Sequence, residues 1–76
     1  MSDEIAIRQD ADRYTIVVDG VDAGFESFAD LPDGSRVLYH TEVDPAFGGR
    51  GLAGTLVAGV LDDIRARGKR FVAVCP

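Results

Sequence analysis

Alternating apolar and polar residues in the first part of the chain predict short β-strands. The segments Ile5–Ile7 and Tyr14–Val18 are each expected to form a strand, because β-branched and aromatic residues favour extended backbone. Asp19-Gly20 follows the second segment directly, and this dipeptide is typical of a two-residue hairpin turn. The pattern therefore predicts a chain that folds back on itself into an antiparallel sheet.

A third strand is expected over Val21–Phe28, and the turn residues Pro32–Gly34 follow it. Successive side chains of a strand point to opposite faces of its sheet. Asp22, Gly24 and Glu26 fall on one parity, so we expect that face of the strand to meet solvent.

A fourth strand is predicted over Ser35–Val43 and ends before Asp44-Pro45. Strict alternation would place Leu38, His40 and Glu42 on one face of the sheet. His40 and Glu42 would then lie roughly 6.6 Å apart, at about 3.3 Å per residue. The other face would carry Val37, Tyr39, Thr41 and Val43.

The second part of the chain has the pattern of a helix followed by a strand. Apolar residues recur every three or four positions, which predicts an amphipathic helix of about four turns. Gly68 suits the end of this helix, because glycine readily adopts the left-handed conformation found there. The segment Phe71–Cys75 is almost entirely apolar and is expected to be a strand covered on both faces. The apolar helix positions are Leu52, Ala53, Leu56, Val57, Val60, Leu61 and Ile64.

The predicted order of elements is β-β-β-β-α-β, which places the fold in the α+β class. Only the fourth strand, the helix and the fifth strand form a βαβ unit, whose strands are parallel. We therefore expect a mixed, mostly antiparallel sheet in which the parallel fourth and fifth strands flank the central helix. With 76 residues, the chain over residues 1–76 is expected to be a single domain.

The chain is acidic, with a formal net charge of −5 at pH 7 and a pI near 4.5. This argues against nucleic acid or an anionic membrane as the main partner, because those ligands need a basic surface. One cysteine and one histidine are too few for an internal disulfide or a metal cluster. No apolar run has the length that spans a bilayer, and the acidic N-terminus differs from a signal peptide. We therefore expect a cytoplasmic protein without a metal.

Three glycines, Gly48, Gly49 and Gly51, lie between the fourth strand and the helix. Glycine lets the backbone turn tightly and approach a ligand closely. A helix N-terminus has unpaired N–H groups and a partial positive charge, so this turn is a candidate phosphate site, and Arg50 adds a charged donor. The alternative is a glycine-rich connection that binds no ligand. No Lys-Ser/Thr pair follows the glycines, which argues against a P-loop.

The segment His40–Gly68, followed by Phe71–Pro76, resembles the short YjdJ-type N-acetyltransferase domains of the GNAT superfamily. The acyl-CoA turn of that family is Arg/Gln-x-x-Gly-x-Gly/Ala. Here the matching stretch keeps Gly51 and Ala53 but has Gly48 where the family often has Arg or Gln. Relatives usually continue past the Cys-Pro with a further helical segment, so we expect that this chain ends early.

The resemblance implies that acetyl-CoA is the cosubstrate and that its acetyl group is transferred to an amine acceptor. It also implies that the fourth and fifth strands splay apart, with the pantetheine arm between them and bonded to the backbone near Glu42 and Val43. The residues expected to bind the coenzyme are Val43, Gly48, Gly49, Arg50, Gly51, Leu52 and Ala53.

Transfer to an amine needs a base, because only the neutral amine attacks the thioester. His40 and Glu42 are the candidates, and Glu42 is the preferred base. Without the resemblance, His40 is interpreted as a hydrogen-bonded strand residue and Glu42 as a solvated charge or a partner of Arg50. Relatives also carry a cysteine at Cys75, which is either a buried thiol or a nucleophile, and we favour direct transfer that does not acetylate this thiol.

Two other functions are consistent with the same residues. A CoA-binding or regulatory module without turnover would also explain the glycine turn, and the small size and Gly48 favour it. A small protein-interaction domain would use an open sheet edge to pair with another chain, including a second copy in a homodimer. Release of thiol from acetyl-CoA separates the transferase from the module, and CoA binding separates both from the interaction domain.

Overall fold

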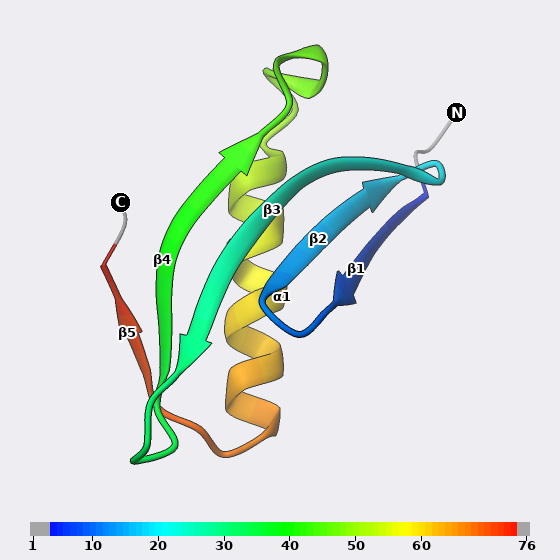
Figure 1. The fold of residues 1–76 in the computed structure, drawn as a ribbon. Coiled ribbons are helices and arrows are strands. Elements are labelled where there is room, and N and C mark those ends of the chain that lie inside the picture. Colours follow the sequence, from blue (N-terminus) through cyan, green and yellow to red (C-terminus); the bar gives the residue numbers. More distant parts are fainter. Residues whose placement is uncertain (1–3, 75–76) are drawn as a thin grey trace.

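The computed structural model, which describes residues 4–74, is a five-stranded sheet with one α-helix packed against one face (Figure 1). The strands lie in the order β1-β2-β3-β4-β5, so neighbours in the sheet are also neighbours along the chain. All pairs are antiparallel except β4 and β5, which are parallel, and the predicted α+β fold is confirmed. The elements are β1 (Ile5–Gln9), β2 (Arg13–Val18), β3 (Val21–Asp30), β4 (Arg36–Val43), the 3-10 helix η1 (Pro45–Phe47), α1 (Leu52–Ala66) and β5 (Phe71–Ala73).

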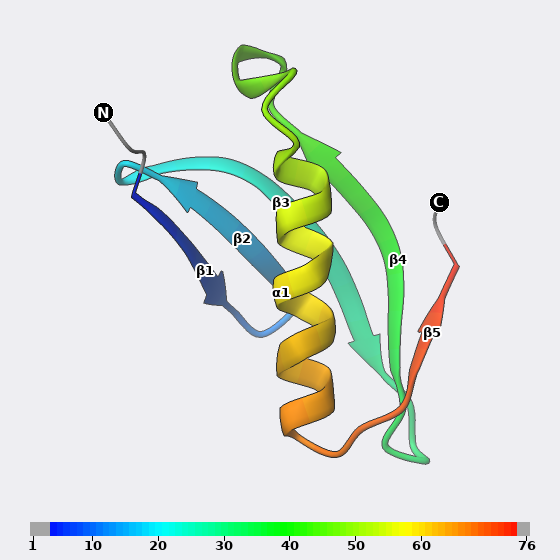
Figure 2. The same cartoon turned by 180° about the vertical axis from the view of Figure 1, so that it is seen from behind.

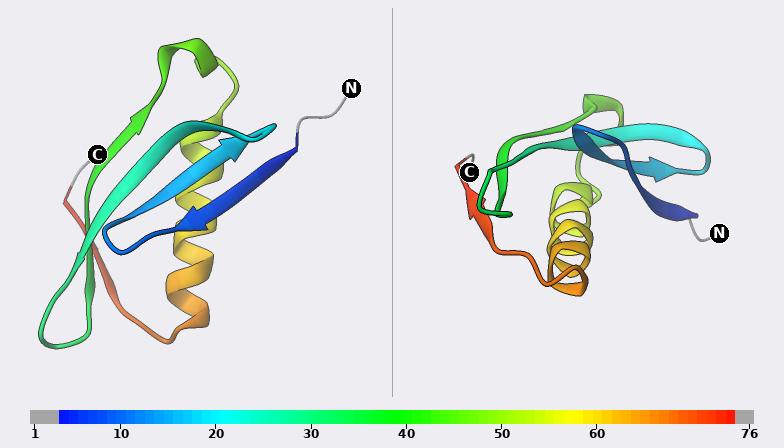
Figure 3. Two further views of the ribbon diagram at one scale, coloured as in Figure 1. Left: turned by 45° about the vertical axis from the view of Figure 1, so that its right-hand side comes forward. Right: turned by 60° about the horizontal axis from the view of Figure 1, so that its bottom comes forward.

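Helix α1 covers one face of the sheet and packs against β2, β3 and β4 (Figures 2 and 3). Its buried residues Leu52, Leu56, Val60 and Ile64 recur every fourth position, which keeps them on the stripe that faces the sheet. Burial of each such side chain contributes about 1.5–3 kcal/mol. Within residues 4–74 no α-helix covers the opposite face of the sheet. The strands contribute Tyr14, Ile16, Val18, Ala23, Phe28 and Leu38 to the same core.

The turn between β2 and β3 has the conformation that the sequence predicts. Asp19 has a φ of +49° and Gly20 a φ of +81°, the left-handed values that a two-residue type I′ turn requires. Because this turn matches the twist of its strands, it fixes how β2 and β3 pair.

The prediction that Phe71–Cys75 is covered on both faces is wrong for the part that the structure describes. Strand β5 is Phe71–Ala73, a short edge strand whose residues are all exposed. Phe71 and Val72 expose 48% and 47% of their surface. The reason is that α1 lies over the middle of the sheet rather than over β5. Cys75 lies outside the described residues.

A β-bulge interrupts the alternation predicted for β4. Phe28 on β3 pairs with Leu38 and the preceding Ser27 pairs with His40, so Tyr39 has no residue opposite it. Beyond this extra residue, each side chain of β4 points to the face of the sheet opposite to the one that strict alternation predicts. Leu38 is buried against α1, whereas His40 and Glu42 lie on the helix-free face. The predicted common face for these three residues is therefore wrong at Leu38.

A second bulge explains why the predicted solvent face of β3 is also wrong. Ile16 pairs with Gly24 and Val17 pairs with Asp22, so Ala23 is the extra residue. Asp22 is exposed on the helix-free face, but Glu26 lies on the helix side and exposes only 3% of its surface. Its carboxylate accepts a hydrogen bond of 2.5 Å from the hydroxyl of Thr41.

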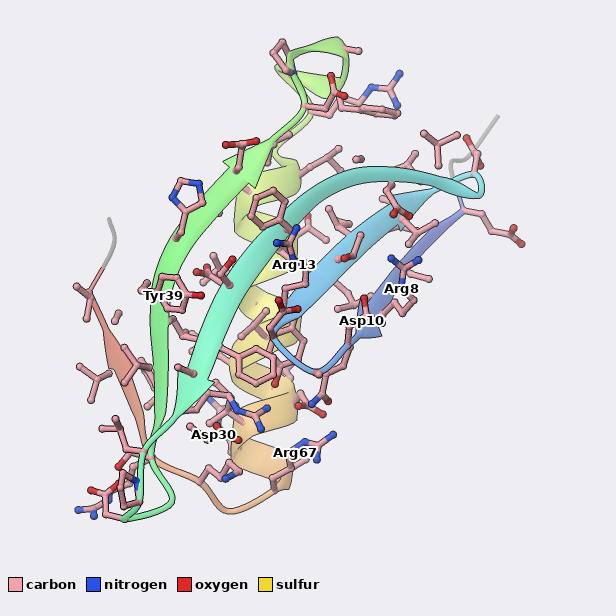
Figure 4. All side chains as sticks on the ribbon, viewed as in Figure 1. Arg8, Asp10, Arg13, Asp30, Tyr39 and Arg67 are labelled. Atoms are coloured by element: carbon pink, nitrogen blue, oxygen red, sulfur yellow. The ribbon has the colours of Figure 1, made fainter. Side chains whose placement is uncertain are left out.

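Arg36, at the start of β4, is a buried arginine that exposes 4% of its surface. It donates from Nε and Nη2 to the two carboxylate oxygens of Asp30, at 2.7 and 3.0 Å, and from Nη1 to the Tyr14 hydroxyl at 2.6 Å. The Tyr14 hydroxyl donates in turn to Asp63 on α1, also at 2.6 Å. The guanidinium lies over the Phe28 ring, 4.1 Å from its centre. This network joins β2, β3 and β4 to α1 near the labelled Asp30 in Figure 4.

Candidate functional site

The segment between β4 and α1 is an exposed glycine turn. Asp44 begins it by accepting a hydrogen bond of 2.9 Å from the Ala46 amide, which caps η1. Gly49 and Gly51 have φ values of +80° and +70°, which side chains of other residues rarely tolerate. A Cβ added at either glycine would meet no atom within 4 Å. These two glycines are therefore required by the backbone conformation, and the space beside them is open.

The N-terminus of α1 presents backbone donors at this turn. Gly51 is the N-cap residue, no side chain caps the helix, and its first turn contains no acidic residue. The N–H groups of Leu52, Ala53 and Gly54 have no acceptor within the helix, and the last two residues are exposed. Together with the positive end of the helix dipole, they favour an anion. The Arg50 guanidinium lies 5.4 Å from the centre of the Phe47 ring on the same turn.

A largely apolar groove of about 420 Å³ starts at this helix end and runs between α1, β4 and β5. Ala53 and Gly54 line it at the first turn of the helix, and Leu61 lines it two turns further along. The buried carboxylate of Glu26, held by Thr41, is its charged group. The groove is lined by Glu26, Leu38, Thr41, Ala53, Gly54, Val57, Leu61, Phe71 and Ala73.

Strand β4 has an open edge beside this groove. It pairs with β5 only over Arg36–Leu38, and the last bond on this edge runs from the Val74 amide to the Leu38 carbonyl at 2.9 Å. Beyond Leu38, β4 continues to Val43 without a strand on that side in the described part of the chain. The two strands diverge in Figures 1 and 2. Backbone groups of β4 are therefore accessible along this edge.

His40 and Glu42 lie together on the helix-free face of β4. Their side chains approach to 3.3 Å between Nε2 and Oε1, and 50% and 63% of the two side chains are exposed. The His40 ring lies against Phe25 of β3, with ring centres 5.7 Å apart. The structure thus brings the two predicted catalytic residues into contact with each other, on the face opposite to the groove. Val43 follows them, half-buried against the core.

The sequence of residues 13–76 matches the family model of the GCN5-related N-acetyl-transferase. The match covers most of the chain and includes β2 to β5, the glycine turn and α1. The chain belongs to the GCN5-related N-acetyltransferase (GNAT) family. No curated protein matches the sequence.

Solved structures of other acetyltransferases have the same fold. The ribosomal-protein-alanine N-acetyltransferase from Brucella melitensis biovar Abortus 2308 is 28% identical with a TM-score of 0.67, over 90% of this chain and 56% of its own. A GNAT-family acetyltransferase from Desulfovibrio desulfuricans is 28% identical with a TM-score of 0.65, over 82% and 43%. An aminoglycoside N-acetyltransferase in complex with CoA is 28% identical with a TM-score of 0.58, over 86% and 49%. The chain spans about half the length of these three structures.

Apart from Ala53, the groove residues were not predicted as coenzyme contacts from the sequence, although the helix carries a signal for them. Val57 and Leu61 lie beside the buried Leu56 and Val60, which makes the apolar stripe of α1 wider than one contact with the sheet requires. This excess predicts a second apolar surface. The structure places it along the groove.

Two further features of the described residues bear on the class of protein. No helix within residues 4–74 is long and apolar enough to cross a membrane. The same residues contain no group of three or more His, Cys, Asp or Glu side chains placed to hold a metal ion.

Proposed function

We propose that the protein binds acetyl-CoA and transfers its acetyl group to an amine, as a short YjdJ-type member of the GNAT family. The observation that carries this proposal is the exposed glycine turn at the N-terminus of α1, which opens directly into an apolar groove. Each of these two features matches one part of CoA: the turn matches its charged pyrophosphate, and the groove matches its long pantetheine arm. The CoA complex of the similar aminoglycoside N-acetyltransferase supports the same coenzyme here.

The residues of the turn and groove fit these two parts of the coenzyme. We assign the pyrophosphate to the amides of Gly49–Ala53 and to Arg50, because bare amides at a helix N-terminus bind phosphate. Gly48 belongs to the same turn. The pantetheine arm would lie in the groove and along the open edge of β4 near Val43, where backbone groups are accessible to its amides.

The proposed chemistry is direct transfer. Bound acetyl-CoA supplies an electrophilic thioester carbon, to which the amine nitrogen forms a bond while the carbon–sulfur bond breaks. Glu42 accepts the proton that the amine loses, and His40, 3.3 Å away, orients the carboxylate. The CoA thiolate leaves and takes up a proton. Cys75 takes no part in this scheme, so incubation with acetyl-CoA alone should leave no acetyl group on the protein.

CoA and acetyl-CoA are expected to raise the melting temperature, since a ligand at a hundred times its Kd stabilises the native state by about 2.7 kcal/mol. Gly51→Asp should weaken CoA by about tenfold or more, because its carboxylate competes for the helix amides and repels phosphate. The added Cβ meets no atom within 4 Å, so the cost to the fold is the backbone strain of a non-glycine residue at a φ of +70°. Thermal-shift titration with CoA, acetyl-CoA and ATP measures both effects.

Gly51→Ala is the matched control, because it imposes the same positive φ without a carboxylate. It should lower the melting temperature of the free protein and keep most of the CoA-induced shift. If Gly51→Asp binds CoA unchanged, the turn has a structural role only. If CoA binds but acetyl-CoA and amines release no thiol, the protein is a coenzyme-binding module rather than a transferase.

Gly48→Arg is expected to tighten CoA binding by about fivefold, the gain of one exposed ion pair with phosphate. Gly48 has a φ of −63° and a ψ of 152°, which any residue adopts. The added Cβ would lie 3.2 Å from the Pro45 carbonyl oxygen, so the loop must shift slightly. Isothermal titration with CoA measures the change. Gly48→Met has a similar length without charge, and equal tightening by this control would refute a phosphate contact.

A further inference from the structure

Glu26 is a buried carboxylate on the helix side of β3, and it lines the apolar groove between α1, β4 and β5. It exposes 3% of its surface, and Thr41, directly opposite on β4, donates a hydrogen bond of 2.5 Å to its Oε1. Within residues 4–74 Glu26 forms no ion pair. A buried carboxylate without a cation costs stability, so packing alone does not account for it.

The second carboxylate oxygen of Glu26 is accessible from the groove. Oε2 makes no hydrogen bond to another described residue, since the Thr41 hydroxyl bonds Oε1. Every fully enclosed side-chain oxygen or nitrogen in residues 4–74 has a partner. Oε2 is therefore not fully enclosed, and the open space that Glu26 lines is the groove. A ligand in the groove can reach this oxygen.

Glu26 and Thr41 reach the same groove through two separate β-bulges. Strict alternation along β3 and β4 would turn both side chains to the helix-free face of the sheet. The extra residues, Ala23 in β3 and Tyr39 in β4, bring them to the helix side instead. Bulges occur often beside active sites, where they re-aim a side chain. Two irregularities thus place one polar pair in an otherwise apolar groove.

This polar pair determines which ligand suits the groove. The Thr41 hydroxyl donates to Glu26, and the other lining residues are apolar or glycine, so the side chains of the groove offer an acceptor and no free donor. A matching ligand is mostly apolar and carries a hydrogen-bond donor. The pantetheine arm of CoA has two secondary amides, each with one N–H donor. Thr41 also lies beyond Leu38, where the edge of β4 is open (Figure 2), so an arm along this edge lies beside Glu26.

We propose that Glu26 is a specificity-determining residue for the coenzyme, whose Oε2 accepts a hydrogen bond from an amide N–H of the pantetheine arm. This inference rests on the proposed coenzyme function. Thr41 is a positioning residue, because it holds the carboxylate through Oε1. Hydrogen bonds to a carboxylate are roughly twice as strong as neutral ones, so this contact fixes where the arm lies along the groove. A chain of similar length without an amide N–H lacks the contact.

Titration calorimetry with two ligands tests the proposal: CoA, and adenosine 3′,5′-bisphosphate, which lacks the arm. Glu26→Met keeps the length of the side chain without its oxygens, so it should weaken CoA by about tenfold and leave the bisphosphate unchanged. The direction is diagnostic, because removal of a negative charge by itself strengthens the binding of an anion. The melting temperature of free Glu26→Met should equal or exceed that of the parent protein, since a buried carboxylate is removed.

Two further variants and a control complete the test. Glu26→Gln keeps a carbonyl acceptor without the charge and should weaken CoA by only about threefold. Thr41→Val releases the carboxylate and should also weaken CoA by about threefold, again without effect on the bisphosphate. Asp62→Asn removes a negative charge from an exposed position on α1 outside the groove, and should not weaken CoA.

The outcomes separate this proposal from the proposed function. Unchanged CoA affinity in Glu26→Met would overturn the proposal, and equal weakening of CoA and the bisphosphate would assign Glu26 a role in the fold instead. If the parent protein binds CoA no more tightly than the bisphosphate, the arm does not occupy the groove, and the inference fails while the phosphate site at the glycine turn stands. If the parent protein binds neither ligand, the coenzyme function fails, and the assignment of Glu26 fails with it.

Discussion

Replacing Glu42 with glutamine is expected to lower kcat at neutral pH by about a hundredfold, measured as thiol release from acetyl-CoA at saturating amine. Glutamine keeps the shape of the side chain but cannot accept a proton from the attacking amine. CoA affinity should change little, because Glu42 lies on the helix-free face whereas the groove lies on the helix side. The loss should therefore appear in the chemical step and not in coenzyme binding.

The control for this substitution is Asp62→Asn, which changes the net charge equally at an exposed site on α1 and should keep kcat. An amine with a low pKa reaches the site already neutral, so the Glu42→Gln defect should shrink with such an acceptor. An equal loss of rate and CoA affinity would assign Glu42 a role in folding. An unchanged rate would leave His40, or a water molecule, as the base.

The overall order of elements could be predicted because each element shows its own periodicity. The four-residue spacing of Leu52, Leu56, Val60 and Ile64 is a local property of the helix, and all four are buried. Asp19-Gly20 likewise encodes its turn through the φ values that these two residues adopt. Such signals need no information about distant segments. They predicted the order of the elements correctly, even though several side chains were assigned to the wrong face of the sheet.

The faces were assigned incorrectly where a strand contains one extra residue. Tyr39 and Ala23 are both unremarkable in the sequence, and neither is a glycine or proline that would mark a bulge. Each nevertheless shifts the parity of every residue that follows it in its strand. This moves Glu26 to the helix side and places Thr41 there beside it. Strict alternation of side chains along one strand cannot reveal such a bulge, because the bulge is defined by the pairing with the neighbouring strand.

The glycine turn and the helix-free face of the sheet differ in the same way. The glycine turn is contiguous in sequence and was predicted as a phosphate site, which remains a prediction until CoA is titrated. The helix-free face, in contrast, is assembled from β1 to β4, and its row of Arg8, Thr15, Phe25 and Glu42 exists only through the pairing register. Thr15 has no sequence feature that separates it from any other strand threonine.

The network around Arg36 was also hidden in the sequence, because an arginine at the start of a strand is usually solvated. Its donors instead bond Asp30 and Tyr14 inside the fold. The hydrogen bonds from Arg36 lower the pKa of Asp30 below its ordinary value of 3.8. A carboxyl with a lowered pKa in the folded state stabilises the protein at neutral pH, and this contribution is lost as the pH falls through its folded-state pKa. The interaction of Arg36 with Asp30 therefore makes the stability of the protein fall at acid pH.

Arg36→Met is expected to destabilise the protein by about 3 kcal/mol, the upper end for hydrogen bonds made by a charged group, because the guanidinium's bonds to Asp30 and to the Tyr14 hydroxyl are lost. The cost is no larger because Asp30 is 43% exposed and can be hydrated once the guanidinium is gone. A domain of this size has a free energy of unfolding of about 5 kcal/mol, so the substitution would remove more than half of it. Urea denaturation at pH 7 measures the loss as a lower midpoint.

The matched control is Arg65→Ala, which removes an arginine whose side chain is 80% exposed and should change stability by less than about 0.5 kcal/mol. Arg36→Lys should recover only part of the loss, because one ammonium cannot bond both Asp30 oxygens and the Tyr14 hydroxyl in the planar geometry of a guanidinium. In Arg36→Met the fall in stability below pH 4 should also be shallower than in the parent protein, since Asp30 then titrates at its ordinary pKa. An unchanged urea midpoint for Arg36→Met would show that Phe28 and the other apolar neighbours hold these strands without the buried charge.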